Sequence, residues 1–239
     1  MYIAIAGNIG SGKSSLTELL AHRYSLQAVF EAVDENPYLE DFYRDMNSYA
    51  FRSQVFFLGK RLEQHLREVN HSERVIQDRT LFEDAAIFAR NLHEAGQIDT
   101  RDWGTYQTLY AGIGPALRVP SVMVFIRCSL PTLRRRIALR GREYERKIPD
   151  EYLERLNALY EEFVASYSLS PMIIVPGDEL DFIRDRYALG WICGQLEAQG
   201  LDRPMLAPSE MLRTVFKSWA SFMPRVSPVY MNSNSHLRL

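Results

Sequence analysis

The chain is poor in cysteine. Its 239 residues include only two, Cys128 and Cys193. Both lie in apolar surroundings, and neither has a second cysteine or a histidine at a metal-binding spacing, which argues against a zinc site and against a disulfide framework. We therefore expect two reduced and buried thiols.

Long apolar runs are also missing. No run approaches the ~20 residues that a membrane-spanning helix needs. The first predicted strand reaches a glycine-rich turn within seven residues, which leaves no room for a signal peptide. Both absences predict a cytoplasmic protein without a membrane partner.

An excess of one charge is absent too, because 28 basic residues face 30 acidic ones and the formal net charge is −2. Such a chain has no broad attraction for a nucleic-acid polymer, so any phosphate binding must be local. Only four of the basic residues are lysines, namely Lys13, Lys60, Lys147 and Lys217. The dominance of arginine favours planar contacts with phosphate or carboxylate, although GC-rich coding would produce the same bias.

The residues that are present are organised around one glycine-rich turn near the start. The apolar run 2–6 leads into this turn, which consists of Gly7, Asn8, Ile9, Gly10, Ser11, Gly12, Lys13 and Ser14. Two glycines bracket four residues and precede Lys-Ser, which is the P-loop pattern in its strand-before, helix-after context. Backbone N–H groups of such a loop cradle phosphate oxygens, while Lys13 adds a positive charge and Ser14 offers a hydroxyl to Mg²⁺. The turn therefore predicts binding of a nucleoside triphosphate such as ATP.

Hydrophobic patterning predicts one α/β domain over residues 1–200, in which strands and helices alternate. Strands are expected at 2–6, 26–30, 73–77, 121–126 and 172–175. Helices are expected at 13–24, from about 37, at 49–69, from about 81 to 94, at 101–117, 130–140, 149–167 and 181–199. This alternation predicts a doubly wound, five-stranded parallel sheet. Residues 201–239 form a C-terminal extension, in which a helix from Ser209 to about Phe222 is expected.

Charged side chains follow the ends of two predicted strands. Glu31 follows the second strand, and Asp78 and Arg79 follow the third. Open α/β sheets bind ligands beyond the carboxyl ends of their strands, so these groups are candidates for an acceptor site. The alternative for Glu31 is a capping role at the helix that starts near Pro37.

Two predicted helices carry polar groups that need a partner. Gln54 and Arg61 share a face of the largely apolar helix 49–69, which indicates a polar pocket unless that face is solvated. In helix 130–140, Arg136 and Arg140 lie one turn apart, and Gly141 ends the helix before Arg142. Arginines converging at a helix end are typical of a mobile lid that clamps a transferring phosphoryl group.

Four segments in order, 7–14, 31–39, 77–84 and 136–145, carry a family resemblance. The chain resembles the deoxynucleoside kinases of the deoxycytidine, deoxyguanosine and deoxyadenosine kinase type over about residues 1–197, and is most similar to the bacterial deoxyadenosine kinase group. The resemblance implies a P-loop kinase fold and ATP- and Mg²⁺-dependent phosphorylation of the 5′-hydroxyl of a deoxynucleoside in nucleotide salvage. Deoxyadenosine is the expected substrate, with deoxyguanosine or deoxycytidine as alternatives. A homodimer paired through helices 49–67 and 82–92 is also implied.

The resemblance further implies a role for each matching position. Glu31 matches the general base, and Arg79 matches the group that holds the 5′-hydroxyl and steadies that carboxylate. Tyr43 and Glu145 match the pair that grips the 3′-hydroxyl. The remaining matches are Gln54, Arg61 and Asp84 for the base edge, Asp78 for ordering Mg²⁺, Arg136, Arg140 and Arg142 for the lid, and Asp178 and Phe182 for the loop near the donor adenine.

Two other functions are compatible with a P-loop. A nucleoside monophosphate kinase needs more basic groups for its acceptor phosphate than a site containing Glu31, Asp78 and Asp84 offers. A nucleotide-dependent switch has no small-molecule acceptor, but the chain has no Asn-Lys-x-Asp motif and no strand that ends in a hydrophobic-Asp-Glu pair. The acidic acceptor site favours a neutral nucleoside.

Overall fold

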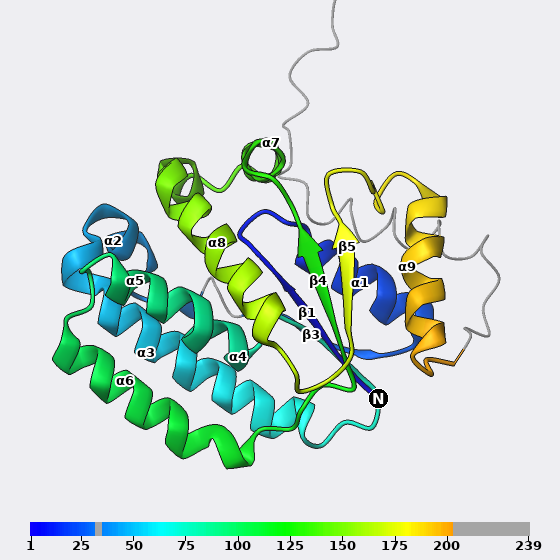
Figure 1. Cartoon of the computed structure of the whole chain (residues 1–239), viewed down its shortest axis with the longest axis horizontal. Coiled ribbons are helices and arrows are strands. Elements are labelled where there is room, and N and C mark those ends of the chain that lie inside the picture. Colours follow the sequence, from blue (N-terminus) through cyan, green and yellow to red (C-terminus); the bar gives the residue numbers. More distant parts are fainter. Residues whose placement is uncertain (32–34, 203–239) are drawn as a thin grey trace, which may run out of the picture. The chain divides into compact units, whose positions relative to one another are not determined.

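The structure is a computed structural model that describes residues 1–31 and 35–202. Its centre is a five-stranded parallel sheet with the strand order β2-β3-β1-β4-β5 (Figure 1). The strands are β1 (Tyr2–Gly7), β2 (Gln27–Val29), β3 (Val75–Asp78), β4 (Val122–Arg127) and β5 (Met172–Pro176). All six residues of β1 are buried, because β1 is central and its sequence is apolar throughout. The predicted doubly wound sheet is confirmed.

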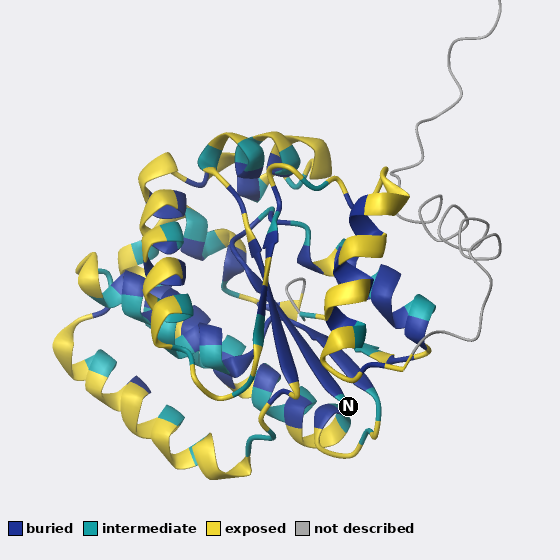
Figure 2. Ribbon diagram, turned by 45° about the vertical axis from the view of Figure 1, so that its right-hand side comes forward, coloured by how far each residue is buried: buried dark blue, intermediate teal, exposed yellow. Residues whose placement is uncertain are grey.

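Helices cover both faces of the sheet, with α1 and α9 on one side and α8 and the stretch 81–94 on the other (Figures 1 and 2). The first half of the chain contributes α1 (Lys13–Tyr24), α2 (Leu39–Arg44), α3 (Met46–Gln64), the π-helical η2 (His65–Val69), α4 (Leu81–Glu83), the π-helical η3 (Asp84–Ala89) and α5 (Arg90–Glu94). The second half contributes α6 (Thr100–Ile113), the 3₁₀ turns η4 (Gly114–Ala116) and η5 (Tyr144–Lys147), α7 (Leu130–Arg140), α8 (Asp150–Ser166) and α9 (Arg186–Ala198).

The last helix begins later than the sequence pattern predicts. The Asp181 carboxylate accepts the backbone N–H groups of Ile183 (3.3 Å) and Arg184 (3.1 Å), which closes a turn. Asp185 then caps α9 by accepting the N–H of Tyr187 at 2.8 Å. Of the predicted C-terminal extension 201–239, residues 203–239, including the helix expected from Ser209, lie outside the described residues.

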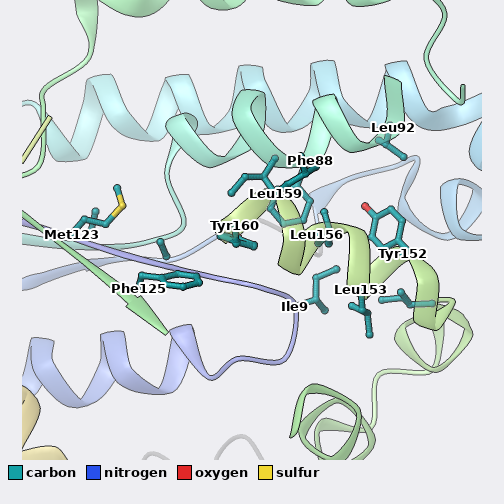
Figure 3. Packing of buried hydrophobic residues seen from close by; sticks show 14 of the residues in the cluster. Ile9, Phe88, Leu92, Met123, Phe125, Tyr152, Leu153, Leu156, Leu159 and Tyr160 are labelled. Carbon is teal, nitrogen blue, oxygen red and sulfur yellow. The ribbon is translucent and has the colours of Figure 1, made fainter. Parts of the chain in front are cut away.

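A core of apolar side chains fills the space between the sheet and α8 (Figure 3). Leu153, Leu156 and Tyr160 form the buried face of α8, and the Tyr160 ring stacks on Phe125 of β4 at 5.4 Å between centroids. Elsewhere, the two cysteines are buried free thiols, as predicted. Within the two described ranges, no helix combines the length and the apolar character needed to cross a bilayer.

Candidate active site

The P-loop connects β1 to α1 and is held in shape by close packing. Gly12 precedes α1 with φ 99°, and a Cβ atom on it would lie 3.1 Å from the Phe182 ring. The Lys13 ammonium donates to the backbone oxygen of Asn8 at 3.0 Å. Burial, followed by the charge of Arg79, lowers the pKa of Lys13 to about 8. The lysine therefore keeps most of its charge at neutral pH, ready for a donor phosphate.

Asn8 anchors the loop to α8 through its side chain. The amide nitrogen of Asn8 donates to the Leu153 oxygen at 2.9 Å and to the Asn157 side-chain oxygen at 2.7 Å. The amide oxygen of Asn8 accepts the N–H of Ile9 at 2.7 Å. The side chain of Asn8 is thus used for shape, which leaves phosphate binding to the backbone of the loop.

Ser14 and Asp78 form a pair that fits Mg²⁺. The Ser14 hydroxyl donates to Asp78 Oδ2 at 2.5 Å, and Asp78 is only 3% exposed. Asp78 Oδ1 is buried and finds no hydrogen-bond partner among the described residues. The part of the chain that is described contains no cluster of three or more histidine, cysteine or acidic ligands. One hydroxyl and one carboxylate suit a magnesium ion that takes its other oxygens from phosphates and water.

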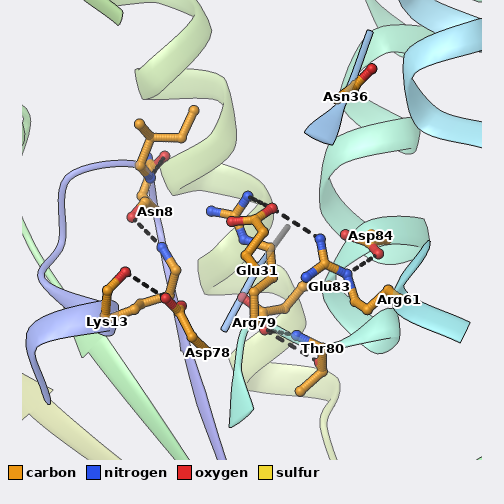
Figure 4. A network of polar contacts seen from close by, with 12 residues as sticks. Asn8, Lys13, Glu31, Asn36, Arg61, Asp78, Arg79, Thr80, Glu83 and Asp84 are labelled. Atoms are coloured by element: carbon orange, nitrogen blue, oxygen red, sulfur yellow. Dashed lines mark hydrogen bonds and ion pairs between the residues drawn. The ribbon is translucent and has the colours of Figure 1, made fainter. Parts of the chain in front are cut away.

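The ends of β2 and β3 bring Glu31 and Arg79 together, as predicted (Figure 4). Glu31 Oε1 accepts from Arg79 at 3.1 Å and from Arg61 at 2.9 Å. Burial alone would raise the pKa of Glu31, but the cations of Arg79, Arg61 and Lys13 outweigh it and lower the pKa to about 2. Glu31 is therefore ionised at neutral pH and can accept a proton.

Gln54 and Arg61 are buried, at 4% and 3% exposure, so the alternative of a solvated face is wrong. Arg61 Nε donates to Asp84 Oδ2 at 2.5 Å, and one guanidinium thereby bridges Asp84 and Glu31. Burial raises the pKa of Asp84 to about 6 against the pull of Arg61, which leaves Asp84 mostly ionised at pH 7. Gln54 lies on the same face of α3 as Arg61, two turns before it.

Tyr43 and Glu145 also come together. The Tyr43 ring stacks on Tyr144 at 5.8 Å between centroids, and Glu145 contributes to the raised pKa of Tyr43, of which burial is the main cause. Glu145 is 2% exposed, and its Oε2 has no hydrogen-bond partner among the described residues. An unpartnered carboxylate oxygen beside a tyrosine is suited to a hydroxyl donor.

The three lid arginines do not converge in this structure. Arg136 donates to the backbone oxygens of Ser11 at 2.5 Å and Gly177 at 2.7 Å, and so joins the P-loop to the segment after β5. Arg140 and Arg142 instead pair with Glu145, the latter at 3.5 Å. The expected C-terminal glycine is present, since Gly141 ends α7 with φ 76°.

The segment after β5 lies against the P-loop. The Asp178 carboxylate accepts the N–H of Ser129 at 3.1 Å, and Phe182 is 3% exposed beside Gly12. The Arg136 guanidinium lies 6.0 Å from the centre of the Phe182 ring. Phe182 is thus adjacent to the P-loop, whereas Asp178 is bound to Ser129 at the start of α7.

The sequence did not indicate that Glu83 and Tyr160 belong to the site. Glu83 bonds to Thr80 and Gly7, and Tyr160 bonds to Glu83 and Gly7. The Thr-x-x-Glu spacing of Thr80 and Glu83 is a capping-box signal that predicts the first contact. No local pattern points to Tyr160, which lies 77 residues after Glu83.

The fold and the site define the class. A P-loop after the central strand, a Ser-Asp pair whose chemistry suits Mg²⁺ ligation, and an arginine of α7 bound to the loop backbone are the parts of a P-loop kinase. A family model described as deoxynucleoside kinase matches residues 3–197. The chain belongs to the deoxynucleoside kinase family.

Individual relatives agree on the family. The chain is 31% identical to a deoxyadenosine/deoxycytidine kinase of Bacillus subtilis, with 81% of this chain and 90% of the relative covered. It is 35% identical to a deoxyguanosine kinase of Lactobacillus acidophilus, covering 76% of this chain and 82% of the relative. Among solved structures, a deoxyadenosine kinase from M. mycoides with bound dATP superposes with a TM-score of 0.74 at 32% identity, over 82% of this chain and all of that one.

Proposed function

We propose that this chain transfers the γ-phosphoryl group of ATP to the 5′-hydroxyl of a deoxynucleoside, with deoxyadenosine as the preferred substrate. The observation that carries the proposal is the Glu31–Arg79 pair, which stands at the strand ends next to the P-loop. An ionised carboxylate there can accept the proton of the 5′-hydroxyl, and Arg79 holds the same hydroxyl in line. The product is a deoxynucleoside monophosphate.

The donor side of the proposal uses the P-loop backbone, Lys13 and the Mg²⁺ pair. When bound, Mg²⁺ would supply positive charge to the donor phosphates, held by Ser14 and through water by Asp78. Lys13 keeps a positive charge beside those phosphates, and the loop N–H groups orient them. Asp178 and Phe182 are proposed to border the donor adenine.

The acceptor side recognises sugar and base separately. Tyr43 and Glu145 are proposed to bind the 3′-hydroxyl, through the unpartnered Glu145 oxygen. Gln54 can donate and accept at once, so it can pair with the amine and ring nitrogen of adenine. Asp84, bound to Arg61, adds an acceptor that suits an exocyclic amine and opposes a keto oxygen.

A panel of the four deoxynucleosides at equal concentration, with ATP and Mg²⁺, tests the substrate proposal. We expect kcat/KM to be highest for deoxyadenosine, then deoxycytidine, because both present an amine beside a ring acceptor. Solved structures of a deoxyadenosine kinase from M. mycoides contain dATP and dCTP, which supports testing both bases. Thymidine phosphorylated as well as deoxyadenosine would refute the base-reading model. A Gln54→Leu variant should lose the adenine preference, whereas Gln107→Leu, on the exposed side of α6, should keep it.

Deoxyguanosine is the alternative to deoxyadenosine as the preferred substrate, since several relatives are deoxyguanosine kinases. The Arg61 guanidinium would have to serve guanine O6 and N7. Its Nε and one terminal nitrogen are already bound to Asp84 and Glu31, which favours adenine. A clear deoxyguanosine preference in the same panel would reverse the roles given to Arg61 and Asp84.

The lid supplies a separate prediction. Arg140→Ala or Arg142→Ala should lower kcat by roughly 10²-fold, with a smaller effect on nucleoside KM, because a clamp on the moving group acts in the transition state. Both arginines pair with Glu145 Oε1, whereas the 3′-hydroxyl is proposed to use the unpartnered Oε2, so nucleoside binding should not weaken. Arg135→Ala, on the exposed face of α7, is the matched control. An effect confined to nucleoside KM would contradict the lid assignment.

For assembly, we propose a homodimer paired through the helices at 49–67 and 82–92. The motive is the family resemblance together with the apolar character of these helices. A monomeric molar mass by light scattering at micromolar concentration would refute this.

A further inference from the structure

Glu83 is a buried carboxylate for which the proposed mechanism has no direct use. It is 0% exposed, and all its recorded hydrogen bonds are to groups beside the active site. Its Oε2 accepts the N–H of Thr80 at 3.0 Å and the Thr80 hydroxyl at 3.3 Å (Figure 4). Its Oε1 accepts the N–H of Gly7 at 3.3 Å. A fully buried carboxyl group costs stability unless its oxygens are hydrogen-bonded, so the arrangement is specific.

Tyr160 of α8 completes the arrangement from the other side. Its hydroxyl lies 2.8 Å from Glu83 Oε1 and 2.7 Å from the backbone oxygen of Gly7. Side chains therefore contact both polar backbone groups of Gly7: Glu83 accepts its N–H, and the single Tyr160 proton is shared between the Gly7 oxygen and Glu83 Oε1. The Tyr160 ring is itself fixed, because it stacks on Phe125 and meets Phe88 edge-on at 6.3 Å.

Gly7 is the first glycine of the P-loop, and its position sets where the loop leaves the sheet. A Cβ atom at Gly7 would lie 2.6 Å from Ser11 Oγ and 3.0 Å from the Ile126 oxygen, so the chain is closely packed here. Any shift of Gly7 would be passed to the phosphate-binding N–H groups that follow it.

The other end of the network reaches Arg79. This residue has φ 65°, in the left-handed region that non-glycine residues rarely adopt. The conformation is held by the Arg79 N–H, which donates to the Ile5 oxygen at 3.0 Å, and by the capping box of Thr80 and Glu83 that follows directly. From this backbone the Arg79 guanidinium reaches Glu31 and lies 4.1 Å from the centre of the Phe88 ring.

We propose that Glu83 and Tyr160 are positioning residues that fix the P-loop relative to Arg79, and hence the donor phosphate relative to the acceptor hydroxyl. This network connects the donor site to the acceptor site. Glu83 accepts the N–H of Gly7, the first residue of the P-loop, and completes the capping box of the helix that follows Arg79. The proposal rests on the proposed phosphoryl transfer. Misplacement of reactants by about 1 Å costs up to ~10²-fold in rate, so the network should affect turnover more than substrate binding.

The test compares kcat and KM for Glu83→Gln, Tyr160→Phe and the double variant. Glutamine keeps the shape of Glu83 but has only one side-chain oxygen. If that oxygen accepts the N–H of Thr80, the amide NH₂ group faces the Gly7 N–H, and two donors then oppose each other. We expect kcat to fall ~10- to 100-fold for Glu83→Gln and ~5-fold for Tyr160→Phe, with nucleoside KM within about twofold. The double variant should be no worse than Glu83→Gln alone, because both changes break one network.

The matched control is Tyr106→Phe, which removes the hydroxyl of another fully buried tyrosine that has no hydrogen-bond partner in the described ranges. Its kcat should equal that of wild type. If Glu83→Gln does not fold, the kcat and nucleoside KM of Tyr160→Phe alone test the proposal. Folded variants whose kcat stays within twofold of wild type would overturn the inference, as would a loss seen only in melting temperature. A wild-type enzyme that phosphorylates no deoxynucleoside would refute the proposed function instead.

Discussion

Glu31→Gln should lower kcat by roughly 10²- to 10⁴-fold and leave deoxynucleoside binding nearly intact. Glu31 Oε1 accepts hydrogen bonds from Arg79 and Arg61, and a glutamine oxygen can accept the same bonds. The local structure should therefore persist. The amide cannot take up the proton of the 5′-hydroxyl, so the loss falls on the chemical step.

Two measurements separate the chemical step from binding. Steady-state turnover at saturating ATP and Mg²⁺ gives kcat, and calorimetry without ATP gives the dissociation constant of deoxyadenosine. Glu35→Gln is the matched control, because Glu35 is exposed and its recorded ion pair is with Lys60 at 2.8 Å. The control should keep wild-type turnover. If Glu31→Gln also turns over at the wild-type rate, Glu31 is not the general base.

The convergence of Glu31, Asp78 and Arg79 on the P-loop was predictable from the sequence. Each follows a strand whose apolar run is visible in the sequence, and parallel strands bring their carboxyl ends to one edge of the sheet. Sheet geometry was sufficient for these residues. The shared face of Gln54 and Arg61, seven residues apart on an apolar helix, also followed from the sequence, but only the structure showed that this face is buried.

Contacts between distant segments were not predictable in this way. The Tyr160 hydroxyl bonds to Gly7, which lies 153 residues earlier in the sequence. The apolar periodicity of α8 predicts only that Tyr160 is part of its buried face. Asn8 fits the P-loop pattern as a phosphate contact, yet its side chain bonds to α8. Tertiary packing decides such pairings, and periodicity in one segment carries no information about its partner.

The lid shows a second limit. Helical spacing places Arg136 and Arg140 on one face of α7, but it does not say what each side chain meets. Arg136 bonds to the P-loop backbone, whereas Arg140 bonds to Glu145, which follows the end of the helix. The partners depend on the turn of the chain after Gly141, and no sequence pattern specified that turn.

Arg61→Met should lower the free energy of unfolding by about 3–5 kcal/mol, the usual cost of removing one partner from a buried ion pair. Arg61 is 3% exposed and bonds to Asp84 at 2.5 Å and to Glu31 at 2.9 Å. Methionine keeps much of the length and the apolar contacts of arginine. It leaves two buried carboxylates without this cation, which is the source of the expected loss.

The loss should depend on pH with a definite sign. The folded-state pKa of Glu31, about 2, lies below its ordinary value of 4.5, so Glu31 stabilises the fold above pH 4.5 and this contribution is lost as the pH falls toward 2. Without Arg61 the pKa of Glu31 rises and that contribution shrinks. The pKa of Asp84, already raised to about 6 by burial, also rises further, so the variant takes up protons that the wild type does not. The gap in stability between wild type and variant should therefore be widest near pH 7 and narrower near pH 4.

Urea unfolding of both proteins at pH 7 and pH 4 measures this gap. Arg44→Met is the matched control, because Arg44 pairs with Asp41 at 3.0 Å on the surface, with 74% of the arginine side chain exposed. Exposed pairs contribute ~0.2–1 kcal/mol, so the control should lose no more than that at either pH. The pH–rate profile gives a second measurement, since a raised Glu31 pKa moves the acid limb of kcat/KM to higher pH. A variant that unfolds within ~1 kcal/mol of wild type at pH 7, with an unshifted acid limb, would show that Arg61 is not the cation that holds Glu31 and Asp84 ionised.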